Sequence, residues 1–335
     1  MNHIPIEKQG VTTKIMQIFN FIVNEIESDK LQKNTQLPSI TVFSKQHGVS
    51  RDTVEKAYKK LIQEGYVKAV KGKGNYILEK KDKRTRILLL FNKLSSYKKI
   101  IYDAFLDTLG DNVRVDLHIH HYNPTVLEEI IKENLGSYHH YVVMPHFLHG
   151  VQEKDYMPIL MSIPSDKLLL LDKNLKLATP HKAVYQDFKF DIYEALNSVT
   201  NLMVRYEGII VVFPQHSQHP VELNEGVMKF CLETNKQFSV ITATTKETIR
   251  PRTVYVVLTE SDLAVLIKQC RELKYQPGKD IGILSFNETV LKELLDITVV
   301  TTDFEAMGRN AAQLILENRC EQIKNPFYLI QRSSI

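Results

Sequence analysis

The chain has 335 residues, of which 43% are hydrophobic and 24% are charged, and its formal net charge at pH 7 is +4. This composition excludes a disordered or fibrous chain, and the length predicts two or three compact units. No apolar run approaches the roughly 20 residues that span a bilayer, and the opening MNHIPIEKQG lacks the apolar segment of a secretory signal.

Cysteine usage bears on the compartment. Cys231, Cys270 and Cys320 are far apart and form no CxxC motif. An odd number of widely spaced cysteines fits a reducing environment and small buried side chains better than disulfides or a redox site. We therefore expect a cytoplasmic protein.

The positive charge is concentrated at the N-terminal end. Residues 1–83 contain 15 Lys and Arg against 9 Asp and Glu, a net charge of +6, whereas the rest of the chain carries 28 against 30, a net charge of −2. A basic module on a near-neutral body indicates a polyanionic partner at that end.

The N-terminal segment predicts three helices. Apolar residues at i, i+3 and i+4 predict an amphipathic helix over 14–27. Ser39 as a cap and Gly48 as a stop define a short second helix, and Ser50 caps a third helix over 51–64. Helices two and three are thus joined by a tight turn.

A hairpin and a linker follow these helices. The short runs 66–70 and 75–78 flank the sequence KGKG, which predicts two strands and a turn. The charged EKKDKR begins a linker, so we expect a first domain over 1–78, a linker over 79–85 and a second domain over 86–335.

From residue 86 onward, strands alternate with helices. Short apolar runs predict strands at 86–91, 115–122, 140–145, 168–172, 183–187, 208–213, 238–242, 253–258 and 280–286. Amphipathic runs between them predict helices at 97–109, 125–135, about 190–205, 222–234, 261–273 and 304–318. This pattern predicts an α/β domain with parallel sheets, in two doubly wound halves over 85–190 and 190–320.

The start of the third predicted helix has the chemistry of a DNA-reading element. A recognition helix places its N-terminal residues against base edges and phosphates. The polar residues in that position are Ser50, Arg51, Thr53 and Lys56. Asp52 and Glu55 stand among them and would repel phosphate unless they face away or accept from a base.

The hairpin tip adds cations and backbone freedom. Its residues are Lys71, Gly72, Lys73 and Gly74. The glycines let the backbone approach a phosphate or a minor groove closely, and the lysines supply charge.

The segment LPS-x₈-GVSRDTV-x₂-AY-x₂-L-x₂-EGYV-x₄-GKGNYI resembles the winged helix-turn-helix of GntR-type transcriptional regulators. The resemblance implies phosphate and base contacts by Ser39, Arg51, Thr53 and the hairpin, or wing. The sequence departs from the family at Thr41, where arginine is common. Thr41 would therefore make a different contact with DNA, and the operator sequence typical of the family cannot be assigned to this protein.

In a domain of two doubly wound halves, a ligand binds between the halves, outside the carboxyl ends of the strands. The candidate ligand residues are therefore those that follow predicted strands: Ser95, Ser96, His146, Asp172, Tyr185, Asp187, Thr242–Thr244, Glu260, Ser261, Asn287, Asp303 and Phe304. Carboxylates, amides and hydroxyls pair with hydroxyl groups, and an aromatic ring stacks on the C–H face of a sugar. We expect a polyhydroxylated ligand.

Segments such as LLLLDKN, PGKDIGILSFNE and ITVVTTDFEAMGRNAAQLIL resemble the effector domain of lactose- and galactose-repressor proteins, which is related to periplasmic sugar-binding proteins. The resemblance implies a two-lobe domain with sugar contacts at Asp172, Tyr185, Asn287 and Glu260. It departs at Leu223, where the family often has arginine, and at Glu260, so ligand identity does not transfer. The two-part design resembles that of arabinose-repressor-type proteins.

Metal and catalytic sites have weaker support. The histidines of HIHH at 118–121, with His139, His140, His146 and His149, lack a carboxylate or cysteine at ligand spacing, so we expect no metal. KGKGNY lacks the order of a P-loop, and no nucleophile elbow, HExxH motif or catalytic carboxylate pair is recognisable. We expect neither a cofactor nor an enzyme.

The sequence therefore predicts a DNA-binding transcriptional regulator, a repressor of carbohydrate genes, controlled by a small sugar and acting as a homodimer on a palindromic operator. Three alternatives stay open: the same regulator with a purine or another polar metabolite as effector, an enzyme that uses the interlobe cleft, and a DNA-binding architectural protein without a ligand. Aromatic rings on both sides of the ligand would favour a purine.

Overall fold

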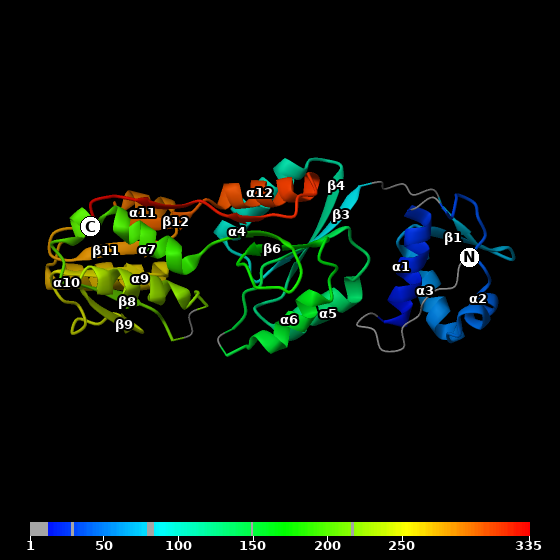
Figure 1. Ribbon diagram of the computed structural model, residues 1–335, viewed down its shortest axis with the longest axis horizontal. Helices are drawn as coiled ribbons and strands as arrows, with labels where there is room; N and C mark the ends of the chain where they lie inside the picture. The colour runs from blue at the N-terminus through cyan, green and yellow to red at the C-terminus, as the bar shows by residue number, and fades with distance from the viewer. Residues whose placement is uncertain (1–12, 28–29, 79–83, 149, 216–217) are drawn as a thin grey trace.

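The computed structural model describes residues 13–27, 30–78, 84–148, 150–215 and 218–335. Three folded units lie in a row along the long axis, with the N-terminal domain at one end (Figure 1). Most of the predicted linker, residues 79–83, lies outside the described residues, as does His149, and Thr85 already pairs with Val113 as the first residue of a strand.

The N-terminal domain, here called the reader, consists of α1 (Lys14–Glu27), α2 (Ile40–His47), α3 (Arg51–Gln63), β1 (Val67–Val70) and β2 (Gly74–Ile77). The three predicted helices and the predicted hairpin are confirmed. The apolar faces of the helices enclose one core that contains the fully buried Ile18, Phe43 and Leu61.

The next unit, the N-terminal lobe, is built on a six-stranded sheet in the order β13-β7-β6-β5-β3-β4. Its strands are β3 (Thr85–Phe91), β4 (Val113–Ile119), β5 (His140–Val143), β6 (Leu168–Asp172), β7 (Lys182–Tyr185) and β13 (Gln322–Lys324). Its helices are α4 (Ser96–Leu109), α5 (Pro124–Asn134), α6 (Glu153–Met161) and α12 (Phe304–Leu316). The pattern did not predict α6, which contains Pro158.

Both faces of this sheet are covered. Ile87, Leu89 and Phe91 of β3 pack in the cluster that includes α4 and α12, whereas Leu88 and Leu90 pack in the cluster that includes α5 and α6. This explains why the strand is a continuous apolar run, because alternate side chains are buried on opposite faces of a parallel sheet.

The C-terminal lobe has a second six-stranded sheet, in the order β14-β12-β11-β10-β8-β9. Its strands are β8 (Gly208–Val212), β9 (Gln237–Ile241), β10 (Thr253–Val257), β11 (Gly282–Phe286), β12 (Thr298–Thr302) and β14 (Phe327–Ile330). Its helices are α7 (Phe188–Ser198), α8 (Thr200–Met203), α9 (Glu222–Glu233), α10 (Glu260–Leu273) and α11 (Val290–Leu294). The sheet is parallel except for β14, which runs antiparallel to β12.

The predicted division into halves at 85–190 and 190–320 is wrong at its second end. α12 follows β12 of the C-terminal lobe but packs on α4 of the N-terminal lobe, where a Cβ at Gly308 would lie 2.9 Å from the backbone nitrogen of Phe105. β13 then pairs with β7 before the chain returns as β14. Alternating order could not reveal this crossing, because helix periodicity does not say which sheet a helix covers.

Within the residues that the structure describes, no helix is long and apolar enough to cross a membrane. Nor does the described part of the chain bring together three or more His, Cys, Asp or Glu side chains in an arrangement that could hold a metal ion.

Candidate functional site

The turn between α2 and α3 is fixed by its caps. Gly48 has a left-handed backbone with φ of 64°, which ends α2. The Ser50 Oγ accepts a hydrogen bond of 3.2 Å from the backbone nitrogen of Thr53 and lies 2.7 Å from the Thr53 Oγ1. The first residues of α3 are exposed, and the helix dipole favours an anion such as a DNA phosphate at this end. Ser39 caps α2 in the same way, at 3.3 Å from the Val42 nitrogen, and Thr41 is exposed on that helix.

Among the described residues, four of the six charged side chains of α3 form two ion pairs, and Arg51 and Lys60 form none. Lys56 pairs with Asp52 and Lys59 with Glu55, both at 2.8 Å. Arg51 is exposed and, within the described chain, forms no ion pair or hydrogen bond. The two acidic residues therefore have cationic partners on their own helix, and the Arg51 guanidinium is available for an outside acceptor.

The segment that precedes α2 holds the turn of the wing in place. Gly72 and Gly74, with φ of 75° and 106°, form the turn between β1 and β2. The Gln36 Nε2 donates a hydrogen bond of 2.6 Å to the Lys73 carbonyl. Residues 34–37 also form backbone hydrogen bonds with β2 and lie beside the hairpin like a third strand. No local sequence pattern indicates this role of Gln36, because its partner is 37 residues away.

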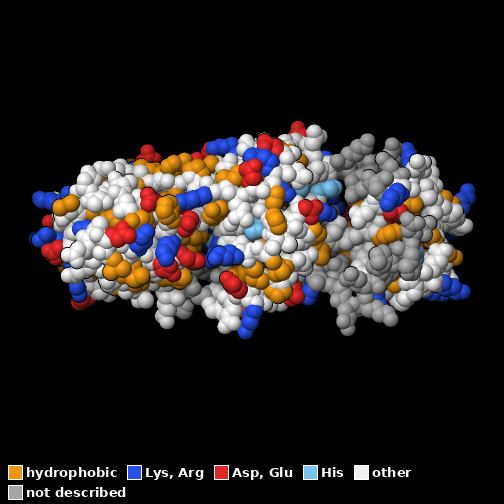
Figure 2. Space-filling view, viewed as in Figure 1, with side chains coloured by type: hydrophobic (Ala, Val, Ile, Leu, Met, Phe, Trp, Pro, Cys, Tyr) orange, Lys and Arg blue, Asp and Glu red, His pale blue; other side chains and the backbone are white. Residues whose placement is uncertain are grey.

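Lys71 and Lys73 project from this braced turn and are exposed. Lys and Arg side chains stand around the outer end of the reader (Figure 2), the end that carries α2 and the hairpin in Figure 1. The predicted DNA-facing residues thus lie on one continuous stretch of local structure at the end of the molecule.

The two lobes enclose a cavity of about 660 Å³, here called the cleft. Seven of the nine principal candidates for ligand contact line it: Ser95, Ser96, His146, Asp172, Glu260, Asn287 and Phe304. Tyr185 and Asp187 are not in its lining. Tyr185 packs against the apolar cluster that includes residues of α5 and α6. The Asp187 carboxylate caps α7 by accepting a hydrogen bond of 3.1 Å from the Phe190 nitrogen.

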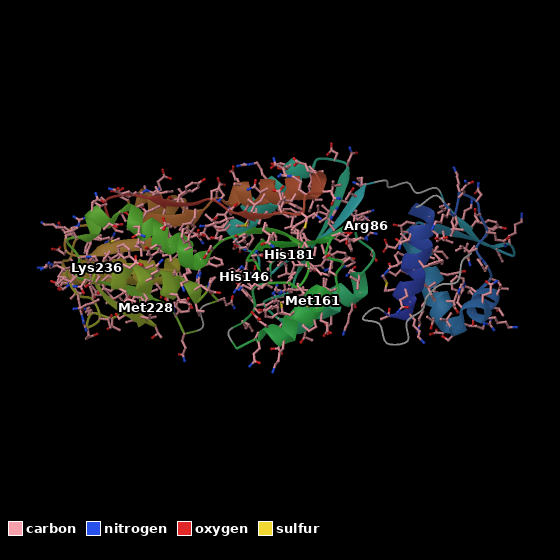
Figure 3. All side chains as sticks on the ribbon, in the orientation of Figure 1. Arg86, His146, Met161, His181, Met228 and Lys236 are labelled. Carbon is pink, nitrogen blue, oxygen red and sulfur yellow. The ribbon has the colours of Figure 1, made fainter. Side chains whose placement is uncertain are left out.

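Asp172 is the centre of the N-terminal wall of the cleft. Its carboxylate accepts from the Lys98 Nζ and the Gln186 Nε2, both at 2.6 Å, and the His146 Nε2 lies 3.1 Å away. Its backbone is left-handed, with φ of 74°. A strained, non-glycine conformation at a strand end is typical of functional sites. Figure 3 shows His146 where the lobes meet.

Electrostatics fix the charges of this group. Burial alone would raise the pKa of Asp172, but the nearby Lys98 and His146 hold that pKa well below its usual range. Burial lowers the pKa of His146, although Asp172 opposes the shift. Asp172 is therefore ionised and faces a lysine ammonium, with a neutral imidazole beside them.

The C-terminal wall is organised around Asn287, which follows β11 and has φ of 65°. The buried Lys292 Nζ donates to the carbonyls of Phe286 and Asn287 at 2.7 and 2.8 Å. Burial lowers the pKa of Lys292 to about 8, against the opposing effect of Glu260 and Glu288. Lys292 thus holds the strand end that presents Asn287 to the cleft.

Other residues of the cleft were not predicted. They include Asn92, Lys93, Tyr97, Lys98, Tyr122, Gln186, Phe188, His219, Phe286 and Lys292. Asn92 and Gln186 directly follow β3 and β7, so the strand-end rule could have found them. Lys98 and Lys292 lie within helices, and only their three-dimensional position shows that they reach the same cavity.

Comparison with known proteins identifies the first domain. Residues 14–77 match the family model described as "Bacterial regulatory proteins, gntR family". The reader is a GntR-type helix-turn-helix domain. The chain is 27% identical over 148 residues to the HTH-type transcriptional regulator TreR of Bacillus subtilis (strain 168), which covers 43% of this chain and 58% of the relative.

A second relative matches over a shorter stretch. The HTH-type transcriptional repressor NagR of Bacillus subtilis (strain 168) is 33% identical over 76 residues, which covers 23% of this chain and 31% of that protein. The matched stretches thus span 58% and 31% of the length of these two relatives, which is less than two thirds of either.

Solved structures share the fold of the remainder. The trehalose repressor from Escherichia coli superposes with a TM-score of 0.58 at 17% identity and covers 73% of this chain and 99% of that one. A LacI family transcriptional regulator from Silicibacter pomeroyi gives 0.61 at 16% identity, with 75% and 98% covered. The lac repressor dimer bound to operator gives 0.58 at 15% identity, with 76% and 95% covered. Following the GntR-type reader, the chain has the two-lobe, periplasmic-binding-protein-like fold of these repressors.

Proposed function

We propose that this protein is a sequence-specific, DNA-binding transcriptional regulator, a repressor of carbohydrate genes whose DNA affinity is controlled by a small molecule in the cleft. The proposal rests on Arg51 at the capped start of α3, which is exposed and has no ion pair among the described residues, and on the basic wing beside it, in a domain that matches the gntR family. The activity places the protein in the cytoplasm with the DNA.

The reader would bind DNA through two kinds of contact. The N-terminus of α3 enters the major groove, where Arg51 can donate two hydrogen bonds to one guanine. The backbone of the α2 and α3 termini and the wing lysines contact phosphates, which position the helix but carry no sequence information.

The effector is a sugar or a sugar-like polar molecule. Support comes from the hydroxyl, amide, carboxylate and ammonium groups that line the cleft from both lobes, and from Asn287, whose side-chain amide has no hydrogen-bond partner among the described residues. A relative and a structural neighbour are named as a TreR regulator and a trehalose repressor. Phe304 already stacks on Tyr97, with ring centroids 5.0 Å apart, so this pair offers a purine less open ring surface.

Binding would act on DNA by closing the lobes. A ligand that contacts both walls favours the closed arrangement by the difference in its affinity for the two states. The chain crosses between the lobes three times: before α7, after β12 and after β13. Closure therefore moves the lobes relative to each other about these three crossings. The fraction of molecules whose paired readers have the DNA-binding geometry then changes.

We also propose that the protein works as a homodimer, with α11 in the interface. Val290, Leu291 and Leu294 of this short helix are 79%, 62% and 79% exposed. A contiguous apolar patch of this kind marks an interaction surface, and a reader of palindromic DNA needs a two-fold partner. Leu291→Asp with Leu294→Asp should yield a monomer in sedimentation experiments, whereas Val204→Asp, at a separate exposed site, should not. A dimer that survives the α11 double variant would place the interface elsewhere.

The whole proposal is tested by combining two measurements on the full chain. Operator fragments are selected from random DNA, and thermal unfolding is followed with monosaccharides, sugar phosphates, nucleosides and purines. A ligand at 100 times its Kd stabilises the protein by about 2.7 kcal/mol. The proposal predicts a selected palindrome and a sugar that both shifts the transition and changes operator affinity. Failure to enrich any DNA would reject the regulator, and a shift with purines alone would reject the sugar.

A further inference from the structure

The reader touches the N-terminal lobe through a surface of its own, apart from the chain that joins them. The Asn20 Nδ2 on α1 donates a hydrogen bond of 2.6 Å to the Leu135 carbonyl at the end of α5. A Cβ at the next residue, Gly136, would lie 2.7 Å from the Asn20 Cγ, and Gly136 has a left-handed φ of 83°. The glycine therefore makes the room into which α1 of the reader fits.

Arg86 lies at the centre of this surface. Its Nη1 is 3.9 Å from the Glu64 Oε2 of the reader, and its Nη2 is 3.7 Å from the Asp116 Oδ2 of the lobe. The guanidinium also stands 4.8 Å from the centre of the Tyr138 ring, and Tyr66 of the reader adds to the electrostatic environment that favours its charge. Figure 3 shows Arg86 on the side of the lobe that faces the reader.

The lobe holds Arg86 ready for this contact. The Tyr138 hydroxyl donates to the Asp116 Oδ2 at 2.8 Å, which fixes both groups that flank the guanidinium. The Arg86 backbone nitrogen donates to the His139 Nδ1 at 2.9 Å. The side chain is only 15% exposed. Burial opposes the charge, but Tyr138, Tyr66 and Glu64 favour it and raise the pKa of Arg86.

The contact is polar and partly open. A cavity of about 390 Å³ lies between the two units, lined by Lys60 and Glu64 of the reader and by Arg114, Asp116 and His118 of the lobe. Both ion pairs of Arg86 are longer than a direct hydrogen bond, and the Arg86 Nε has no partner within the described chain. Surfaces of this kind between domains separate and re-form, so the contact can serve as a detachable dock.

We propose that Arg86 is a positioning residue that docks the reader on the N-terminal lobe, so that lobe motion carries the reader with it. In the docked arrangement α1 faces the lobe while α2 and the hairpin point outward (Figure 1), so the proposed DNA surface stays accessible. Resting on the proposed function, the consequence is that docking in a dimer fixes the distance between two readers, and hence the half-site spacing that the protein accepts.

A cross-linking experiment tests docking without any reference to DNA. In a Cys320→Ser background, Asn20→Cys with Gly136→Cys places two thiols at the contact, and Gln46→Cys with Gly136→Cys places one thiol on the outward-facing α2. Under mild oxidation the first pair should cross-link at least tenfold faster than the second, and adding Arg86→Gln should slow it towards the control. Equal rates for the two pairs would overturn docking.

Because Gly136 has a strained φ, the same comparison is repeated with Ser137→Cys in its place. Thermal unfolding of each variant shows whether both units are folded before the rates are compared. Equal rates in the folded variants of either series overturn docking, and a faster contact pair supports it.

A DNA experiment tests the consequence. Selected palindromes are altered by one or two base pairs between half-sites, and their affinity for wild type, Arg86→Gln, Glu64→Gln and the control Gln63→Ala is measured. Wild type and the control should lose at least tenfold in affinity with altered spacing, and the Arg86 and Glu64 variants less than threefold, with half-site affinity unchanged. Retained spacing discrimination in both variants would overturn the role of Arg86. Absence of any DNA binding by wild type would reject the proposed function, and the cross-linking result would still decide docking.

Discussion

The reader and the cleft differ in how far apart in the sequence their functional residues lie. The proposed DNA contacts fall between Ser39 and Gly74, on two helix starts and one turn, whereas the cleft draws its lining from Asn92 to Phe304. Among the described residues, the exposed Arg51 of the reader has no ion pair, whereas the buried Asp172 of the cleft accepts hydrogen bonds from Lys98 and Gln186. A local site can act as soon as its element folds, but the cleft exists only when both lobes and their three crossings are in place.

The largest expected effect comes from the most open group of the reader. Arg51→Ala should reduce operator affinity at least 100-fold, because a buried guanine acceptor would lose a bidentate partner and the capped end of α3 would lose its charge. Effector affinity should not change. Fluorescence anisotropy with a selected operator measures the first quantity and calorimetry the second. Lys59→Ala, whose side chain pairs with Glu55 on the same helix, serves as the control and should cost less than threefold. Equal losses in both variants would contradict the role of Arg51.

A substitution at the centre of the cleft wall should have a smaller effect, and it is measured on effector affinity instead of operator affinity. Asp172→Asn should lower effector affinity at least tenfold, because the amide cannot replace the carboxylate that holds Lys98, Gln186 and His146. Operator affinity without effector should stay within twofold of wild type. Asp187→Asn, at a carboxylate that caps α7 outside the cleft lining, is the control. If the Asp172 variant retained full effector affinity, the ligand would bind away from this wall.

Acid should separate the two regions. Burial lowers the pKa of His120, His140 and His219 to about 4, and all three belong to the lobes. The unfolded chain binds their protons from about pH 6.5 downward, so the unfolded state holds more protons between pH 6.5 and 4 and stability falls as the pH falls. The loss at pH 5 is about 1 to 2 kcal/mol for each histidine.

Urea unfolding at pH 7.5 and pH 5 measures this loss. His120→Asn should reduce the difference in the free energy of unfolding between the two pH values, and His118→Asn, at an exposed site two residues earlier on β4, should leave it unchanged. A reader that unfolded first at pH 5 would contradict the assignment of the acid-sensitive groups to the lobes.

The smallest effect concerns the wing. Each of Lys71→Ala and Lys73→Ala should reduce the slope of log affinity against log salt by about one unit, because each lysine neutralises about one phosphate. Lys30→Ala, a lysine of the reader that pairs with Glu25, should leave the slope unchanged. Titrations over a range of salt concentrations decide the matter, and an unaltered slope in the double wing variant would remove the wing from the DNA interface.

Prediction from the sequence succeeded where structure is local. Ser50 caps α3 and Gly48 ends α2 because capping needs only the hydrogen bonds and dihedral angles of neighbouring residues. The strand-end rule placed Asp172 and Asn287 at the cleft, since carboxyl ends of parallel strands meet at one edge. It failed for Tyr185, whose side chain points to the opposite, apolar face of its strand, because period-two alternation does not say which face will be the ligand side.

By itself, then, the sequence determined the order of elements, the chemistry of the reader's exposed end and the α/β class of the lobes, because periodicity, caps and turns act over a few residues. Only the tertiary structure decided that α12 covers α4, that Lys98 and Lys292 reach the cleft, and that Arg86 meets Glu64 across the domain boundary. These features join residues far apart in the chain, and their geometry follows from which apolar faces pack together.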